Sequence, residues 1–268
     1  MRIPFFSPRR PTVAVIRLQG AIGIPARHGA AGLSDAGLAA LLDRAFRRGK
    51  PVAVALAINS PGGSPVQSSL IAARIRRLSE RHDVPVHAFV EDVAASGGYW
   101  LATAADRIWA DESSVLGSIG VISAGFGFAE LIARHGIERR VHTAGRSKSW
   151  LDPFRPETPE DVDRLHRLLE PIHAAFKAQV AARRGDRLAA GRDLFTGEIW
   201  VGREAVEVGL ADGIGHLEPT MRQMFGDKVR LVSYGQRVPF LRRFGISADD
   251  WVDAATERAA FARVTPQG

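Results

Sequence analysis

The chain has 268 residues, no cysteine and a formal net charge of +7. The lack of cysteine excludes disulfides, thiolate metal ligands and a cysteine nucleophile. The positive charge comes from scattered arginine pairs, without a long basic run or a basic–aromatic pattern, so nucleic acid is not an expected partner. Peripheral contact with anionic lipid headgroups stays open. The hydrophobic content of 46% is that of a globular protein with a substantial core.

The first half of the chain predicts a flexible N-terminal arm, residues 1–11, followed by alternating strands and helices. Apolar, β-branched runs predict strands at 12–18, 52–58 and 85–91. Helical spacing and capping residues predict helices at 35–48, 66–81 and 97–105. This βαβαβα order predicts an α/β fold with a largely parallel sheet and covering helices. In such sheets, functional loops gather at the carboxyl ends of the strands.

The second half predicts a less regular arrangement that completes one domain over residues 12–235. Strands are expected at 107–110, 138–143 and 228–233, and helices at 128–135, 159–184, 203–208 and 216–225. Residues 236–268 predict a C-terminal tail that is basic and then amphipathic. No stretch reaches the ~20 apolar residues needed to span a bilayer. The first residues also lack the apolar segment of a signal peptide, so we expect a cytoplasmic or membrane-peripheral protein.

Ser96 lies in the turn Ala94-Ala-Ser-Gly-Gly-Tyr99, between a predicted strand and a predicted helix. A hydroxyl beside backbone N–H groups that lack a helical acceptor is the minimum equipment for acyl transfer. A helix cap in a tight turn would give the same pattern. Gly62 and Gly63 follow the preceding strand. Their N–H groups could form an oxyanion hole, or the two glycines could simply close the strand.

A serine nucleophile needs a base, and the eight histidines form no convincing constellation for catalysis or for a metal. Lysine is the alternative, and Lys148 is the only one of the four lysines in a Gly/Ser loop flanked by apolar residues. Loss of hydration makes an ammonium group easier to deprotonate, so a desolvated lysine can act as a general base. The competing interpretation is a loop lysine that stays in water.

Four motifs then occur in a fixed order: Asn59-Ser-Pro-Gly-Gly-Ser64, Ala94-Ala-Ser-Gly-Gly-Tyr99, Gly117-Ser-Ile-Gly-Val121 and Ala144-Gly-Arg-Ser-Lys148. Together they resemble the signal peptide peptidase A family of Ser–Lys proteases, over about residues 12–233. Residues 195–213 also resemble the carboxy-terminal segment of that family. The resemblance implies a Clp protease/crotonase-like fold and a Ser–Lys peptidase domain over residues 12–235.

The resemblance also implies a role for each motif residue. Ser96 would be the nucleophile, Lys148 the general base and Ser118 the serine that orients the lysine. The N–H groups of Gly63 and Gly97 would form the oxyanion hole, and no metal or other cofactor is implied. The substrate would be a peptide, either signal-peptide-like or otherwise unfolded and hydrophobic.

Short members of the family assemble into rings, so the resemblance implies a homo-oligomer. In such rings the serine and the lysine of one active site can come from neighbouring protomers. Typical members carry an N-terminal membrane anchor, which this sequence does not show. A cytoplasmic or membrane-peripheral peptidase is therefore the expectation.

Two other functions stay open. A crotonase-type acyl-CoA enzyme would share the fold and the oxyanion hole. It would need a carboxylate acid or base, which the loops at 62–68 and 96–99 do not contain. A non-catalytic oligomeric scaffold would keep the fold without using the Ser96 hydroxyl.

Overall fold

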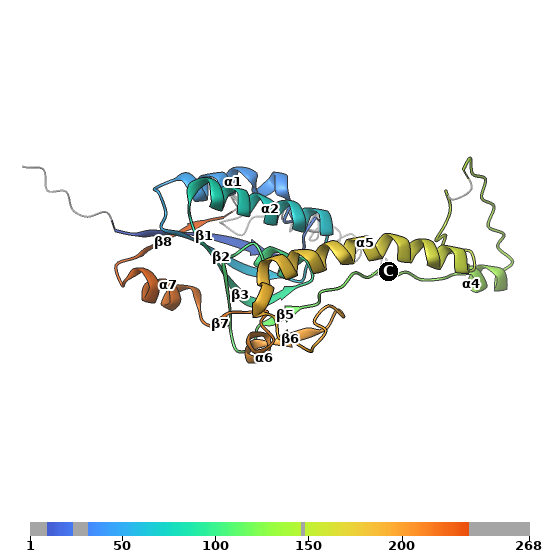
Figure 1. Ribbon diagram of the computed structural model, residues 1–268. Helices are drawn as coiled ribbons and strands as arrows, with labels where there is room; N and C mark the ends of the chain where they lie inside the picture. The colour runs from blue at the N-terminus through green and yellow to red at the C-terminus, as the bar shows by residue number, and fades with distance from the viewer. Residues whose placement is uncertain (1–9, 24–31, 146–147, 236–268) are drawn as a thin grey trace, which may run out of the picture.

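The computed structural model describes residues 10–23, 32–145 and 148–235 (Figure 1). The predicted C-terminal tail and most of the predicted N-terminal arm lie outside these residues. The strands are β1 (Thr12–Gln19), β2 (Ala53–Ser60), β3 (Val86–Ala95), β4 (Arg107–Ala110), β5 (Val115–Gly117), β6 (Ile199–Val201), β7 (Gly213–Ile214) and β8 (Arg230–Tyr234). The helices are α1 (Asp35–Arg47), α2 (Pro65–His82), α3 (Gly97–Ala102), α4 (Ala129–Arg134), α5 (Pro159–Arg184), α6 (Gly202–Glu207) and α7 (Leu217–Phe225), with a 3₁₀ turn at Gly185–Arg187.

One sheet runs through the molecule in the order β6-β5-β3-β2-β1-β8, and β4 pairs with both β3 and β7. All of these pairs are parallel except β5–β6, which is antiparallel. The predicted α/β class with a largely parallel sheet is therefore confirmed. β3 is unusually long because its first part pairs with β4 and its last three residues pair with β5.

Helices cover both faces of the sheet (Figure 1). On one face, α1, α2 and α3 pack on β1, β2 and β3 to form the main apolar core. On the other face, α7 packs on a smaller cluster that includes Val15, Ala55 and Phe89. Residues of β2 enter both clusters, which explains its continuous apolar sequence. None of the helices in the described residues is long and apolar enough to cross a membrane.

Several predicted boundaries differ from the structure. β2 and β3 run on to Ser60 and Ala95, because each continues to pair with its neighbour up to the loop. The short strands β5, β6 and β7 were not predicted, since two or three residues carry too little periodicity. The predicted strand at 138–143 is wrong: this segment is exposed and has no strand beside it to pair with.

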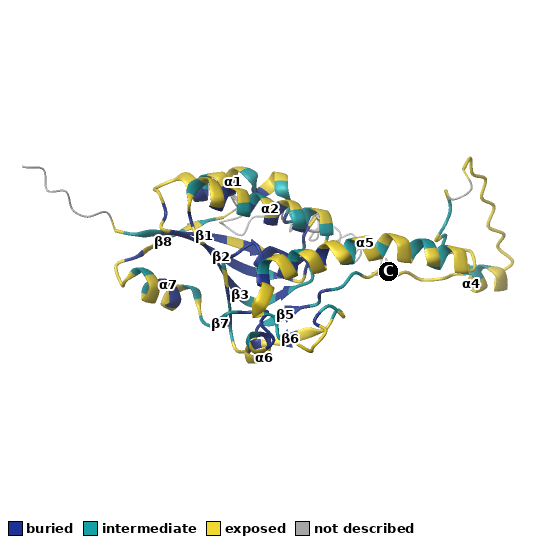
Figure 2. Ribbon diagram, viewed as in Figure 1, coloured by how far each residue is buried: buried dark blue, intermediate teal, exposed yellow. Residues whose placement is uncertain are grey.

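Residues 121–175 form an elongated extension that projects from the rest of the chain, which we call the body (Figure 1). None of the described residues in the extension is buried (Figure 2). The helix α5 joins the two parts, and its buried residues are only Phe176, Val180 and Arg184, all near its carboxyl end. The apolar stripe predicted along α5 therefore enters the core only where the helix reaches the body.

Candidate active site

Ser96 sits where the long strand β3 ends and the short helix α3 begins. Its backbone φ is +50°, a conformation that residues with a side chain adopt rarely and at a cost. The side chain makes no capping hydrogen bond to α3, so the helix-cap interpretation of this serine does not apply. The backbone instead holds the residue, because the Ser96 N–H donates to the Gly117 carbonyl oxygen at 2.8 Å.

Ser118 follows the neighbouring parallel strand, so it lies at the same edge of the sheet as Ser96. The register pairs Ala95 with Gly117, the residues just before the two serines. Ser118 also has a positive φ, +51°, and its N–H donates to the Glu198 carbonyl oxygen at 2.7 Å. Only glycine fits at position 117, since a Cβ there would lie 2.8 Å from the Trp200 ring.

Gly63 and Gly97 bring two backbone N–H groups together beside Ser96. A Cβ on Gly97 would lie 3.3 Å from the Gly63 nitrogen, and one on Gly63 would lie 2.2 Å from the Ile22 carbonyl oxygen. Neither N–H has a hydrogen-bond acceptor within residues 10–23, 32–145 and 148–235. Two close, unpaired donors are the arrangement that an oxyanion requires.

The four residues Ser96, Ser118, Gly63 and Gly97 line one cleft of about 670 Å³. The remaining lining is largely apolar and comes from the body and from the root of the extension: Pro61, Pro65, Trp100, Gly120, Val121, Ile122, Ile172, Phe176, Thr196 and Gly197. None of these lining residues is a histidine, aspartate or glutamate. The chemistry available in the cleft is thus hydroxyl groups, backbone donors and apolar walls.

Lys148 does not join this cleft within one chain. It is exposed and lies in a turn between α4 and α5, where its N–H donates to the Gly145 carbonyl oxygen at 3.1 Å. In Figure 1 the loop between α4 and α5 lies in the part of the extension that is remote from the sheet. The stretch of α5 from Phe176, which lines the cleft, back to Pro159 spans about 25 Å at ~1.5 Å per residue.

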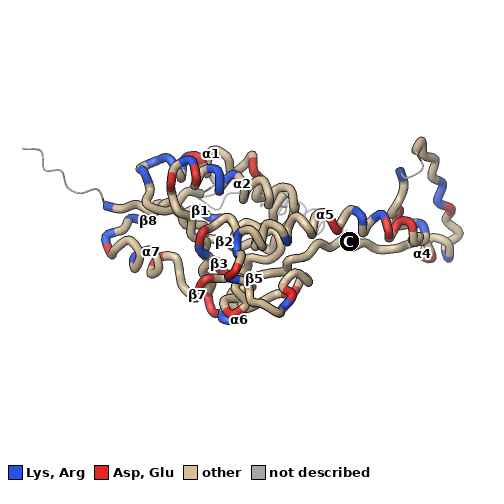
Figure 3. Tube along the Cα trace, in the orientation of Figure 1, with Lys and Arg blue, Asp and Glu red and all other residues tan. Residues whose placement is uncertain are grey.

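Tyr99, a titratable residue close to Ser96 in the sequence, is part of the packed core. Tyr99 in α3 is fully buried, its hydroxyl donates to the Leu210 carbonyl oxygen at 2.9 Å, and burial raises its pKa. No group of three or more His, Asp or Glu residues is placed to hold a metal ion in the part of the chain that the structure describes. Lys and Arg are interspersed with Asp and Glu along the trace, in agreement with the dispersed charge of the sequence (Figure 3).

Comparison with known proteins gives a consistent family. The sequence pattern described as peptidase family S49 matches residues 79–229. A putative protease of Synechocystis, slr0021, is 31% identical over 246 residues, which cover 90% of this chain and 85% of that protein. A solved structure of a mutant of the 1510-N membrane-bound stomatin-specific protease aligns with a TM-score of 0.49 and 13% identity, over 84% of this chain and 97% of that one.

A closer sequence match carries a different name. A Brucella abortus protein named Na(+)/H(+) antiporter NhaA is 51% identical over 219 residues, which cover 82% of this chain. The chain spans only 30% of the length of that relative. The name therefore belongs to a protein of which this chain matches less than a third.

Proposed function

Since the chain belongs to peptidase family S49, we propose that it is a serine endopeptidase with Ser96 as its nucleophile. The observation that carries the proposal is the cleft in which the Ser96 and Ser118 hydroxyls meet the unpaired N–H groups of Gly63 and Gly97. The Clp protease/crotonase-like fold that the sequence resemblance implied is part of this proposal. A positive φ at Ser96 supports the assignment, since such strain is concentrated at functional residues.

In the proposed reaction, a neutral Lys148 amine accepts the proton of the Ser96 hydroxyl as its oxygen attacks the peptide carbonyl carbon. The carbonyl electron pair moves to oxygen, and the N–H groups of Gly63 and Gly97 stabilise that charge. The lysine ammonium then protonates the leaving amine, and an acyl-enzyme forms. Water, deprotonated by the same lysine, releases the second product. Ser118 orients the lysine, and no cofactor takes part.

We further propose that Lys148 reaches the Ser96 of a neighbouring copy in a homo-oligomer. Lys148 is exposed and lies in the loop between α4 and α5, which Figure 1 shows away from the sheet, and this supports the arrangement. The extension also exposes large apolar side chains, among them Ile122 at 85% and Phe126 at 81%. Surfaces of this kind are commonly covered by a partner. Packing against another copy would remove these side chains and Lys148 from water together.

The substrate class follows from the walls of the cleft. Trp100, Ile122, Ile172 and Phe176 offer apolar contact and no charge, which favours peptides with apolar side chains next to the cleaved bond. An unfolded or signal-peptide-like segment fits this requirement. A crotonase-type acyl-CoA reaction is less well supported, because no described residue lining the cleft is a carboxylate.

The test uses Ser96→Ala and Lys148→Ala in the full chain, with a hydrophobic fluorogenic peptide as substrate. Each variant should lose at least ~10³-fold in kcat/KM while the fold is retained, because each removes a group that acts on the reacting atoms. Ser113→Ala and Lys177→Ala, which change an exposed serine and an exposed lysine outside the cleft, are the controls and should keep full activity.

Labelling with a fluorophosphonate gives a second readout. The reagent should modify the wild-type protein at Ser96 and leave Ser96→Ala unmodified. Wild-type turnover in Ser96→Ala would reject the nucleophile. A well-folded oligomer that neither cleaves peptides nor takes up the label would favour the non-catalytic scaffold.

A further inference from the structure

The part of α5 that lies in the body, just after the root of the extension, is hydrogen-bonded to the end of α3, the helix that follows Ser96. In the last turns of α5, the guanidinium of Arg183 donates from Nε to the Thr103 carbonyl oxygen at 2.9 Å and from Nη2 to the Ala105 carbonyl oxygen at 3.0 Å. One turn earlier, Gln179 Nε2 donates to Thr103 Oγ1 at 3.1 Å. Thr103 is the residue that ends α3. These contacts therefore join α5 to the carboxyl end of the nucleophile helix.

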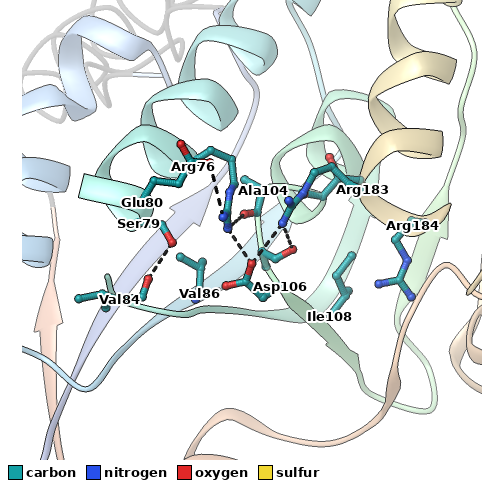
Figure 4. A network of polar contacts seen from close by, with 12 residues as sticks. Arg76, Ser79, Glu80, Val84, Val86, Ala104, Asp106, Ile108, Arg183 and Arg184 are labelled. Carbon is teal, nitrogen blue, oxygen red and sulfur yellow. Dashed lines mark hydrogen bonds and ion pairs between the residues drawn. The ribbon is translucent and has the colours of Figure 1, made fainter. Parts of the chain in front are cut away.

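The same point receives support from α2. Arg76 donates to the Asp106 carboxylate at 2.8 Å and to the Ala104 carbonyl oxygen at 3.3 Å, and Arg183 reaches the same carboxylate oxygen at 3.3 Å. Figure 4 shows the two guanidinium groups converging on Asp106 from α2 and α5. The last carbonyl groups of a helix lack intrahelical partners, and basic side chains can satisfy them. Arg183 binds the carbonyl oxygen of Thr103, the residue that caps α3, and the two arginines bind the next two carbonyl oxygens along the chain.

An apolar contact continues this connection toward the cleft. Phe176, on the same helix as Arg183, stacks on Trp100 of α3 with ring centroids 4.8 Å apart. Both rings line the cleft that contains Ser96. Helix α3 has only six residues, all of them buried, so we expect it to respond to a displacement as a rigid unit. A displacement at Thr103 is therefore passed on to Ser96, at the other end of α3.

We propose that Arg183, assisted by Gln179, is a positioning residue that couples the extension to Ser96 by fixing the carboxyl end of α3. The inference rests on the proposed peptidase function. A strained backbone such as that of Ser96 persists only when the surrounding residues stabilise it. The two hydrogen bonds from the Arg183 guanidinium to the segment after α3 supply part of that stabilisation. Packing of the extension on a neighbouring copy would place Lys148 at the Ser96 of that copy. Through α5 and Arg183, the same packing would also fix the position of Ser96 in its own chain.

The test compares Arg183→Met with wild type in the full-length oligomer. Methionine keeps much of the apolar stem and removes the donors. The kcat should fall by about 10- to 100-fold with KM within about twofold, since a small displacement of a reacting group costs this much in rate. The rate of fluorophosphonate labelling of Ser96 should fall in parallel. Arg183→Lys, which restores one charged donor, should recover part of the loss.

Arg74→Met is the matched control. The Arg74 side chain is as exposed as that of Arg183, 25% against 26%, and its ion pair with Asp35 likewise ties two helices together, but its hydrogen bonds go to Asp35 and not to α3 or the segment after it. This variant should lose stability to a similar extent and keep the wild-type kcat. If Arg183→Met fails to fold, Gln179→Met decides the matter, with an expected two- to fivefold fall in kcat, a rough range for one neutral hydrogen bond.

Three results would overturn the positioning role. The first is a wild-type kcat in folded Arg183→Met or Gln179→Met while Ser96→Ala is inactive, which leaves the proposed function standing. The second is a fall in kcat that only follows loss of the oligomer. The third is an equal fall in Arg74→Met. Activity in Ser96→Ala would instead reject the proposed function itself.

Discussion

The body and the extension differ in how firmly they hold the two proposed catalytic residues. In the body, the Ser96 N–H donates to the Gly117 carbonyl oxygen, and every residue of α3, the helix that follows Ser96, is buried. In the extension, Lys148 lies on an exposed turn and no described residue is buried. Half of the proposed site is thus formed within the chain, and the other half depends on what covers the extension.

The helix α5 belongs to both regions, and its exposed surface marks the boundary between them. Phe176 is 2% exposed and stacked on Trp100, whereas Leu168, two turns earlier, is 53% exposed. An isolated chain would leave that part of α5 and the aromatic cluster of Phe126, Phe128 and Phe154 in water. In the proposed oligomer, folding of the body and packing of the extension on a second copy would be separate steps, and the proposed Ser–Lys catalysis would require both.

The largest expected effect comes from mixing two inactive variants. Ser96→Ala keeps Lys148, and Lys148→Ala keeps Ser96, so a mixed oligomer can place the intact serine of one copy beside the intact lysine of another. Random assembly from equal amounts should restore about one quarter of the wild-type sites. Peptide cleavage should be measured for each variant alone and after co-expression of the two.

A second mixture serves as the control. Ser96→Ala co-expressed with the double variant Ser96→Ala/Lys148→Ala has no intact serine and should stay inactive. No recovery in the first mixture, with assembly shown to be mixed, would mean that the lysine and serine act within one chain.

The next effect separates the two ends of α5. Phe176→Ala removes a buried ring from the body and should cost about 3–5 kcal/mol in the free energy of unfolding. Leu168→Ala should leave the helix content unchanged, because this side chain is exposed within one chain, and should shift the proposed oligomer toward dissociation. Chemical unfolding at one fixed protomer concentration and sedimentation velocity measure the two effects. Equal loss of folding stability in both variants would contradict the division of α5 into a part buried in the body and an exposed part.

Much of the Ser96 side of the site could be predicted because its signals are local. Strand-to-turn patterns and paired glycines placed the Gly63 and Ser96 loops at one edge of a parallel sheet, and the structure brings them together there. Ser118 came only from the family resemblance. The strand before it, β5, has only three residues. It forms because it pairs with β3 and β6, and its own sequence shows no strand pattern.

The Lys148 side could not be predicted in the same way. The segment 138–143 was predicted to be a strand, but a strand needs a neighbour, and among the described residues this segment lies in the extension without one. The apolar residues beside Lys148 suggested a desolvated lysine, yet within one chain it is exposed. Apolar residues in a sequence predict burial, but they do not say whether the same chain supplies the contacts.

The smallest expected effect is a pH dependence that belongs to the body alone. His87 in β3 is 4% exposed, its Nδ1 has no partner among the described residues, and its ring packs edge-on to Phe225. Burial lowers the pKa of His87 below its ordinary value of 6.5. Well above pH 6.5 the imidazole is neutral in the folded and in the unfolded protein, so its protonation does not affect the free energy of unfolding. As the pH falls below 6.5, the unfolded chain takes up a proton that the folded chain resists, and stability is lost.

His87→Phe should therefore flatten the fall in the free energy of unfolding between about pH 7 and pH 5, because the substituted ring cannot take up a proton. Urea unfolding at a fixed protomer concentration across this range measures the slope. His135→Gln, which changes an exposed histidine of the extension, is the control and should retain the wild-type slope. If His135→Gln flattened the slope and His87→Phe did not, the acid sensitivity would lie in the extension, and packing between copies, not packing of the body, would set the lower pH limit of the folded protein.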